Sequence, residues 1–120
     1  MAADELPEDL AARWYEYWRL RSGSRAERDA IAHGRPAHVQ QAHDYVAARV
    51  AERGQPAVDL LVHLAEAGPA GDDGMTVGSG PLEELLRGHD RKTLELVAVA
   101  ARRSALFGRA VSHAVMPPDV

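Results

Sequence analysis

Histidine is the residue type in this sequence with the most versatile chemistry, because near neutral pH an imidazole can act as an acid, a base or a metal ligand. His33, His38 and His43 are spaced five residues apart, which on a helix turns each roughly 140° from the one before. They cannot share a helix face. His63 and Glu66 can share one, but two ligands fall short of the three that a catalytic zinc site normally offers. We therefore predict no metal site.

His89 and Asp90 form a second candidate pair, in a turn where a carboxylate could orient an imidazole base. No nucleophile with a recognisable motif accompanies them, and we expect Asp90 to cap the helix that follows. Glu83 and Glu84 are adjacent, so on a helix they point about 100° apart and do not form a carboxylate pair. We expect Glu83 to cap a helix and Glu84 to be solvated. The sequence predicts no catalytic residues.

The turn that begins at Gly80 is the strongest candidate for a binding site. Pro81 suits the first position of a helix, and Glu83 can reach back to a free backbone amide there. Free amides at a helix start can hold an anion or the carboxylate of a partner. If the chain has a binding surface, we expect it to comprise this turn, the following turn and two adjacent arginines: Gly80, Pro81, Glu83, His89, Asp90, Arg102 and Arg103.

Basic residues gather near the ends of the last three expected helices: Arg87, Arg91, Lys92, Arg102, Arg103 and Arg109. As a patch they could dock an acidic partner. No helix-turn-helix with a polar recognition face is apparent, and a pI of about 5.8 lacks the overall basic signature of nucleic-acid binding. The patch favours a protein partner over nucleic acid.

Two further clusters have simple structural interpretations. The glycines between residues 68 and 80 are not followed by Gly-Lys-Ser/Thr, and no expected strand precedes them, so they predict an exposed, flexible loop and no nucleotide cofactor. Trp14, Tyr15, Tyr17 and Trp18 lie at helical spacing. We expect both tryptophans to face the core and Tyr15 to be exposed.

Composition favours a folded domain of ordinary kind. Hydrophobic residues make up 46% and charged residues 27% of the 120 residues, and the net charge is −4. We expect a single domain over residues 1–120, with 1–6 and 116–120 as tails. The chain has no cysteine, which excludes disulfides and thiolate catalysis. The acidic N-terminus does not resemble a signal peptide, and no run approaches the roughly 20 apolar residues of a membrane span. We expect a cytoplasmic protein.

Apolar residues at helical spacing predict an all-α fold of about six helices, arranged as an irregular bundle or as a short stack of helical hairpins. The first helix should begin at Pro7 and end near residues 22–24. A short helix over 24–33 should start with a capping box from Ser24 and Glu27. Longer helices are expected over 36–53 and 56–67, then helices from Pro81, over 93–102 and from Ser104. The helices over 56–67 and 93–102 are nearly all apolar, which predicts that both are central.

A resemblance to a known family rests on residues 80–86, which read GPLEELL, on the following Gly88 and His89, and on residues 103–110, which read RSALFGRA. These resemble a bacterial family of domains of unknown function, numbered 6869. The likeness covers the C-terminal half well, but an aromatic common at the end of that family is replaced here by Val115-Met116-Pro117. The resemblance implies an all-helical fold and no established activity, substrate or cofactor. Immunity proteins of bacterial toxin systems are neighbouring small helical families, by analogy only.

Three functions stay open. The leading hypothesis is a non-enzymatic module, immunity-like or an adaptor, that binds one protein partner without a cofactor. The alternatives are a small ligand-binding or hydrolytic domain that uses Glu83, His89 and Asp90, and a weak nucleic-acid binder that uses the C-terminal arginines.

Overall fold

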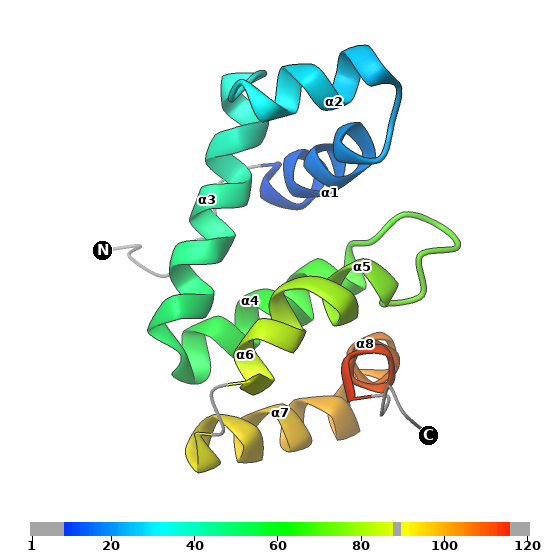
Figure 1. Ribbon diagram of the computed structural model, residues 1–120. Coiled ribbons are helices and arrows are strands. Elements are labelled where there is room, and N and C mark those ends of the chain that lie inside the picture. Colours follow the sequence, from blue (N-terminus) through cyan, green and yellow to red (C-terminus); the bar gives the residue numbers. More distant parts are fainter. Residues whose placement is uncertain (1–8, 88–89, 116–120) are drawn as a thin grey trace.

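A computed structural model describes residues 9–87 and 90–115, which form helices and turns with no strand (Figure 1). The all-α prediction is confirmed. The elements, in order, are α1 (Leu10–Arg21), α2 (Arg25–Ala32), α3 (Ala37–Glu52), α4 (Gly54–Glu66), α5 (Met75–Val77), the π-helical turn η1 (Gly78–Leu82), α6 (Glu83–Arg87), α7 (Arg91–Arg103) and α8 (Ala105–Val115). Because α5, η1 and α6 follow one another directly, residues 75–87 form one helical segment.

Helix α1 packs against both α2 and α3, and α2 lies at the end of the molecule away from α7 (Figure 1). The short α2 forms with the predicted capping box: Glu27 N donates to Ser24 Oγ at 3.1 Å, and Ser24 N donates to Glu27 Oε1 at 2.9 Å. Trp14 is buried and the half-buried Trp18 packs against buried core residues, so both tryptophans face the core as predicted. The prediction that Tyr15 is exposed is wrong, because Tyr15 is half-buried and its hydroxyl donates to the Leu64 carbonyl oxygen at 2.6 Å. The predicted start at Pro7 lies outside the described residues.

Helix α4 is the centre of the bundle, as predicted. Its apolar residues surround most of the helix, and α3, α7 and α8 all contact it. Its buried residues are Ala57, Val58, Leu60, Leu61, Leu64 and Ala65. A helix that is apolar on most sides is stable only where other helices cover those sides, which explains its position.

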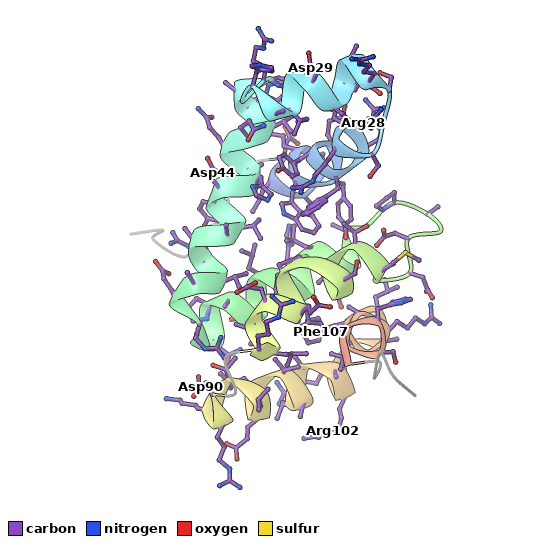
Figure 2. The ribbon with its side chains drawn as sticks, in the orientation of Figure 1. Arg28, Asp29, Asp44, Asp90, Arg102 and Phe107 are labelled. Atoms are coloured by element: carbon purple, nitrogen blue, oxygen red, sulfur yellow. The ribbon has the colours of Figure 1, made fainter. Side chains whose placement is uncertain are left out.

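The prediction that the helix over 93–102 is central is wrong. In α7 only Thr93 and Val97 are buried, and Val99 is 37% exposed. The outward face carries Arg91, Glu95 and Arg102, and Arg102 points away from the body of the protein (Figure 2). Several of the other apolar residues of α7 are alanines, which bury little area, so one narrow stripe is enough to attach the helix.

The predicted loop over residues 68–80 ends at Gly74, because residues 75–80 are helical. Glycine here serves close packing: a Cβ on Gly78 would lie 2.3 Å from the Ala110 carbonyl oxygen, so η1 approaches α8 more closely than any side chain allows. Pro81 therefore lies inside a helical segment and does not start one. A proline ring clashes with the carbonyl four residues earlier in a regular α-helix, and the wider π turn gives that ring space.

Candidate functional site

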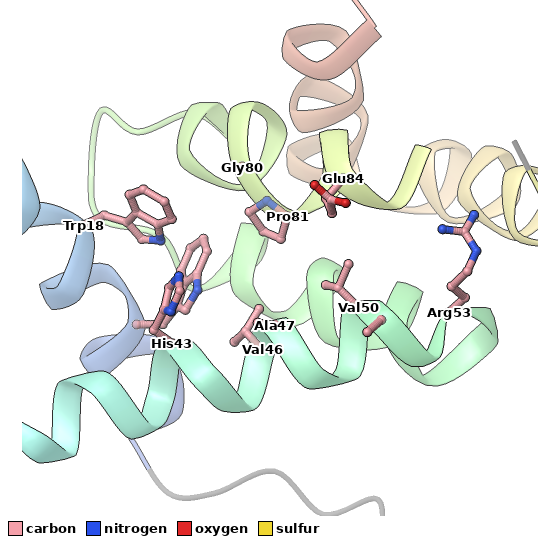
Figure 3. A pocket seen from close by; sticks show the side chains of 11 residues that line it. Trp18, His43, Val46, Ala47, Val50, Arg53, Gly80, Pro81 and Glu84 are labelled. Atoms are coloured by element: carbon pink, nitrogen blue, oxygen red, sulfur yellow. The ribbon is translucent and has the colours of Figure 1, made fainter. Parts of the chain in front are cut away.

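A cleft of about 510 Å³ lies between α3 and the η1–α6 segment, with Trp18 of α1 at one end (Figure 3). Its lining residues are Trp14, Trp18, His43, Val46, Ala47, Val50, Ala51, Arg53, Gly80, Pro81 and Glu84. Trp14, Val46 and Val50 are buried and give it an apolar floor. The volume is typical of ligand sites, which span about 300–1,000 Å³.

Small residues keep this cleft open. Ala47 and Ala51 are exposed on the face of α3 that borders the cleft, and Gly80 presents no side chain from η1. The half-buried Trp18 lies close to Gly80, because a Cβ on this glycine would be 3.9 Å from the indole ring. Trp18 and Gly80 also line a neighbouring hollow of about 740 Å³. Larger side chains at these three positions would fill the space.

Two buried hydrogen-bond donors of the cleft lack an acceptor among the described residues: Trp18 Nε1 and one terminal nitrogen, Nη2, of Arg53. Trp18 lies at one end of the cleft and Arg53 at the other (Figure 3). A buried donor without a partner costs about 1–3 kcal/mol, so native proteins rarely keep one unless water or a ligand satisfies it. Each donor therefore marks a position where water or an occupant of the cleft would supply an acceptor.

The backbone and Asp90 together position Arg53. Arg53 has a left-handed φ of 59° between α3 and α4, a conformation uncommon for a residue with a side chain. Its Nε lies 3.8 Å from Asp90 Oδ2. Thr93 Oγ1 donates to that same Asp90 oxygen and accepts from Gly54 N at 3.3 Å. This network ties the α3–α4 junction to the start of α7.

The charge on Asp90 is stabilised by the same network. The hydrogen bond from Thr93 is the main cause that holds the pKa of Asp90 below its usual range, and the positive charge of Arg53 acts in the same direction. Asp90 therefore stays ionised at neutral pH and holds one side of the Arg53 guanidinium.

Aromatic rings fix the Trp18 end of the cleft. The Tyr17 and His43 rings are stacked with their centroids 3.9 Å apart, and the Trp18 ring meets His43 edge-on at 5.8 Å. The Arg21 guanidinium lies over the Trp18 ring, 5.3 Å from its centroid. Cation–π and edge-to-face contacts of this kind each contribute about 0.5–1.5 kcal/mol. The indole is therefore held in one orientation.

His43 makes this end of the cleft sensitive to acid. Burial lowers the pKa of His43 from its ordinary value of 6.5; Asp44 opposes the shift, and Arg21 adds to it. Because the folded state disfavours the charged imidazole, the stability that depends on neutral His43 is complete above pH 6.5 and is lost as the pH falls toward the folded-state pKa.

We therefore predict that wild-type protein unfolds at a lower urea concentration about one pH unit below 6.5 than about one unit above it. His43→Gln should reduce that difference, whereas His33→Gln, at an exposed position of the α2–α3 turn, should not. Urea titrations followed by circular dichroism measure both variants. Equal pH dependence in the wild type and His43→Gln would contradict the assignment.

The structure brings some of the predicted site residues together and separates others. Gly80 and Pro81 line the cleft, and Asp90 reaches it through Arg53. The prediction that Glu83 caps a helix start is wrong. Glu83 follows directly after the helical turn η1, and its carboxylate pairs with the Arg87 guanidinium at 3.0 Å. His89 lies outside the described residues.

Arg102 and Arg103 are exposed at the end of α7 and do not line the cleft. Three of the six residues of the predicted basic patch pair with acids: Arg87 with Glu83 and Glu84, Arg91 with Glu95, and Arg109 with Asp73. Such pairing weakens the attraction of the patch for an acidic partner.

Sequence reasoning missed Trp18, His43 and Arg53 as site residues. The only local signal for Arg53 is its place just before Gly54, where one helix must end and another begin. Nothing local marks Trp18 or His43, since their spacing is also that of core residues.

Among residues 9–87 and 90–115, no group of three or more His, Cys, Asp or Glu side chains could hold a metal ion. None of the helices described is long and apolar enough to cross a membrane. A scan against protein-family models and searches of curated proteins and of solved structures found no match. The functional proposals therefore rest on the geometry of the cleft.

Proposed function

We propose that the chain is a non-enzymatic helical interaction module that binds a protein partner through the cleft between α3 and η1–α6. The observation that carries this proposal is the pair of buried donors, Trp18 Nε1 and Arg53 Nη2, which have no acceptor among the described residues. An occupant with oxygen acceptors at both ends would satisfy them. The apolar floor between them would bind its hydrophobic part.

The length of the cleft supports a protein segment as its occupant. The lining runs along α3 from His43 to Ala51 and includes Arg53 just after the helix, a span that corresponds to about 15 Å at 1.5 Å per residue. An extended peptide covers that length with about four or five residues.

The proposal includes a cytoplasmic location, bacterial origin and membership of family 6869, which the motif residues and composition support.

A small-molecule ligand is the second candidate, and the volume of about 510 Å³ favours it. A hydrolytic role has less support, because the two described carboxylates of that hypothesis have different partners: Glu83 pairs with Arg87, and Asp90 accepts from Thr93.

A matched pair of variants tests the proposed function. Ala47 and Ala48 are adjacent and exposed on α3, but only Ala47 lines the cleft. Tagged wild type, A47F and A48F are incubated with lysate of the source cells, and the retained proteins are quantified by mass spectrometry. We expect a partner that wild type and A48F retain and A47F loses, because the phenyl ring fills the cleft. With the purified partner, A47F should raise the Kd about tenfold or more.

Thermal unfolding of the three proteins checks that each variant folds. Equal retention by A47F and A48F would exclude the cleft as the docking site. If no protein is retained by any of them, the chain does not act as an interaction module in those cells.

A further inference from the structure

We infer that the partner enters the cleft as a peptide segment with a carboxylate at one end, which pairs with Arg53, and a backbone carbonyl at the other, which accepts from Trp18 Nε1. This inference rests on the proposed function and specifies the chemistry of the occupant.

The carboxylate follows from the state of Arg53. Its Nε faces Asp90, whose Oδ2 already accepts a hydrogen bond from Thr93. Arg53 lines the cleft, and its Nη2 has no acceptor among the described residues. A guanidinium presents its donors in a planar fork that matches a carboxylate, and such charge-assisted bonds are roughly twice as strong as neutral ones. A carboxylate, which offers two anionic oxygens, is therefore the group that best complements the partly paired guanidinium of Arg53.

Glu84 restricts where that carboxylate can lie. It is the acidic residue of the lining, its side chain is 67% exposed, and it pairs with Arg87 at 3.3 Å. In Figure 3 it projects over the middle of the cleft, between Pro81 and Val50. A second acid at the centre of the occupant would face Glu84 and be repelled. The segment should be acidic at the Arg53 end and apolar in the middle.

Trp18 determines which group of the peptide binds at the other end of the cleft. An indole N–H only donates, and Trp18 Nε1 has no acceptor among the described residues. A backbone carbonyl is the acceptor that every peptide carries whatever its sequence. With about 15 Å along the lining from His43 to Arg53, the acid should follow or precede that carbonyl by about four residues of extended chain.

Selection from a phage-displayed library of random linear dodecapeptides tests this chemistry. Wild type and A48F should enrich apolar peptides with Asp or Glu at one fixed position, and A47F should not. For the best peptide, Arg53→Gln should raise the Kd about tenfold or more, and Asn or Gln in place of the peptide's acid should do the same. W18F should raise it less, about two- to tenfold, because a neutral hydrogen bond is lost.

Arg49→Gln is the matched control, since Arg49 lies on α3 outside the cleft lining, paired with Glu52 and over the Tyr45 ring. It should leave the Kd unchanged. Circular dichroism checks the fold of each variant. If R53Q does not fold, the substitution of the peptide's acid, measured with wild-type protein, decides the question alone.

The outcomes separate this inference from the proposed function. The carboxylate inference is overturned if the selected peptides require an open cleft but lack an acid, or if the Kd is unchanged when the acid is replaced. Either result is still consistent with the cleft as the docking site. If no peptide depends on the cleft, both are overturned. Arg53-dependent binding of 4-phenylbutyrate in calorimetry, with no peptide selected, would replace the peptide with a small carboxylate ligand.

Discussion

Replacing Gly74 by alanine is expected to lower the free energy of unfolding by about 2–5 kcal/mol, a large loss for one added methyl group. Gly74 has a φ of 82°, and its Cβ would lie 2.7 Å from Ala110 N and 3.0 Å from both Ala110 Cα and Leu106 O. The left-handed backbone costs about 1–2 kcal/mol for a residue with a side chain. The remainder is the cost of pushing α8 away, because all three neighbours are backbone atoms.

Gly71→Ala separates the two causes. Gly71 has a φ of 90°, but a Cβ there would meet nothing within 4 Å. We expect it to cost only the backbone strain, about 1–2 kcal/mol. Urea unfolding followed by circular dichroism gives both values. Equal losses in the two variants would show that the segment at residue 74 does not pack against α8 as described.

Phe107→Ala is expected to cost about 3–5 kcal/mol of unfolding free energy. Phe107 lies on α8, is 0% exposed and belongs to the main core cluster together with α4 residues such as Leu61 and Leu64 (Figure 2). Truncation removes its apolar contacts and leaves a cavity that the surrounding helices can only partly close.

The neighbouring Leu106 is the control for Phe107. Leu106 is half-buried and borders a surface hollow, so Leu106→Ala should cost less than half as much. The same urea titrations measure it, with tryptophan fluorescence as a second probe. A loss at Leu106 equal to or greater than that at Phe107 would contradict the described packing of α8.

Local sequence rules predict much of this fold. Ser24 and Glu27 form their capping box, and Ser104 Oγ accepts from Phe107 N at 3.2 Å at the start of α8, as expected. The apolar run of α4 becomes the centre of the bundle. These features depend on residues within a turn or two of one another, so spacing and side-chain type are enough to identify them.

Features that depend on a distant neighbour could not be predicted in this way. The composition of residues 68–80 predicts that Gly74 and Gly78 belong to a loop. In the structure both positions require glycine because the α8 backbone lies too close for a Cβ. Likewise, the apolar residues of α7 suggest a central helix, because the sequence does not show that partners cover only one side of it. In both cases the deciding partner is remote in the sequence.

The candidate site shows the same division. Gly80 and Pro81 were predicted as binding residues because a helix start exposes amides, yet they line the cleft from within a helical segment. Trp18 and Arg53 are far apart in the sequence and meet across one cleft only after α3 has packed on α1 and η1. No spacing rule joins residues that separate helices bring together.

The position of Trp18 also links the cleft to a distant helix. Its half-buried ring packs against both the main core cluster and the smaller cluster of Tyr17, Leu20, Ile31 and Val39. Ile31 is the buried residue of α2, so α2 depends on that smaller cluster for its attachment. Under the proposed function, an occupant that holds the indole more firmly would also favour the docked state of α2, and by thermodynamic reciprocity loosening α2 would weaken the occupant's affinity by the same factor.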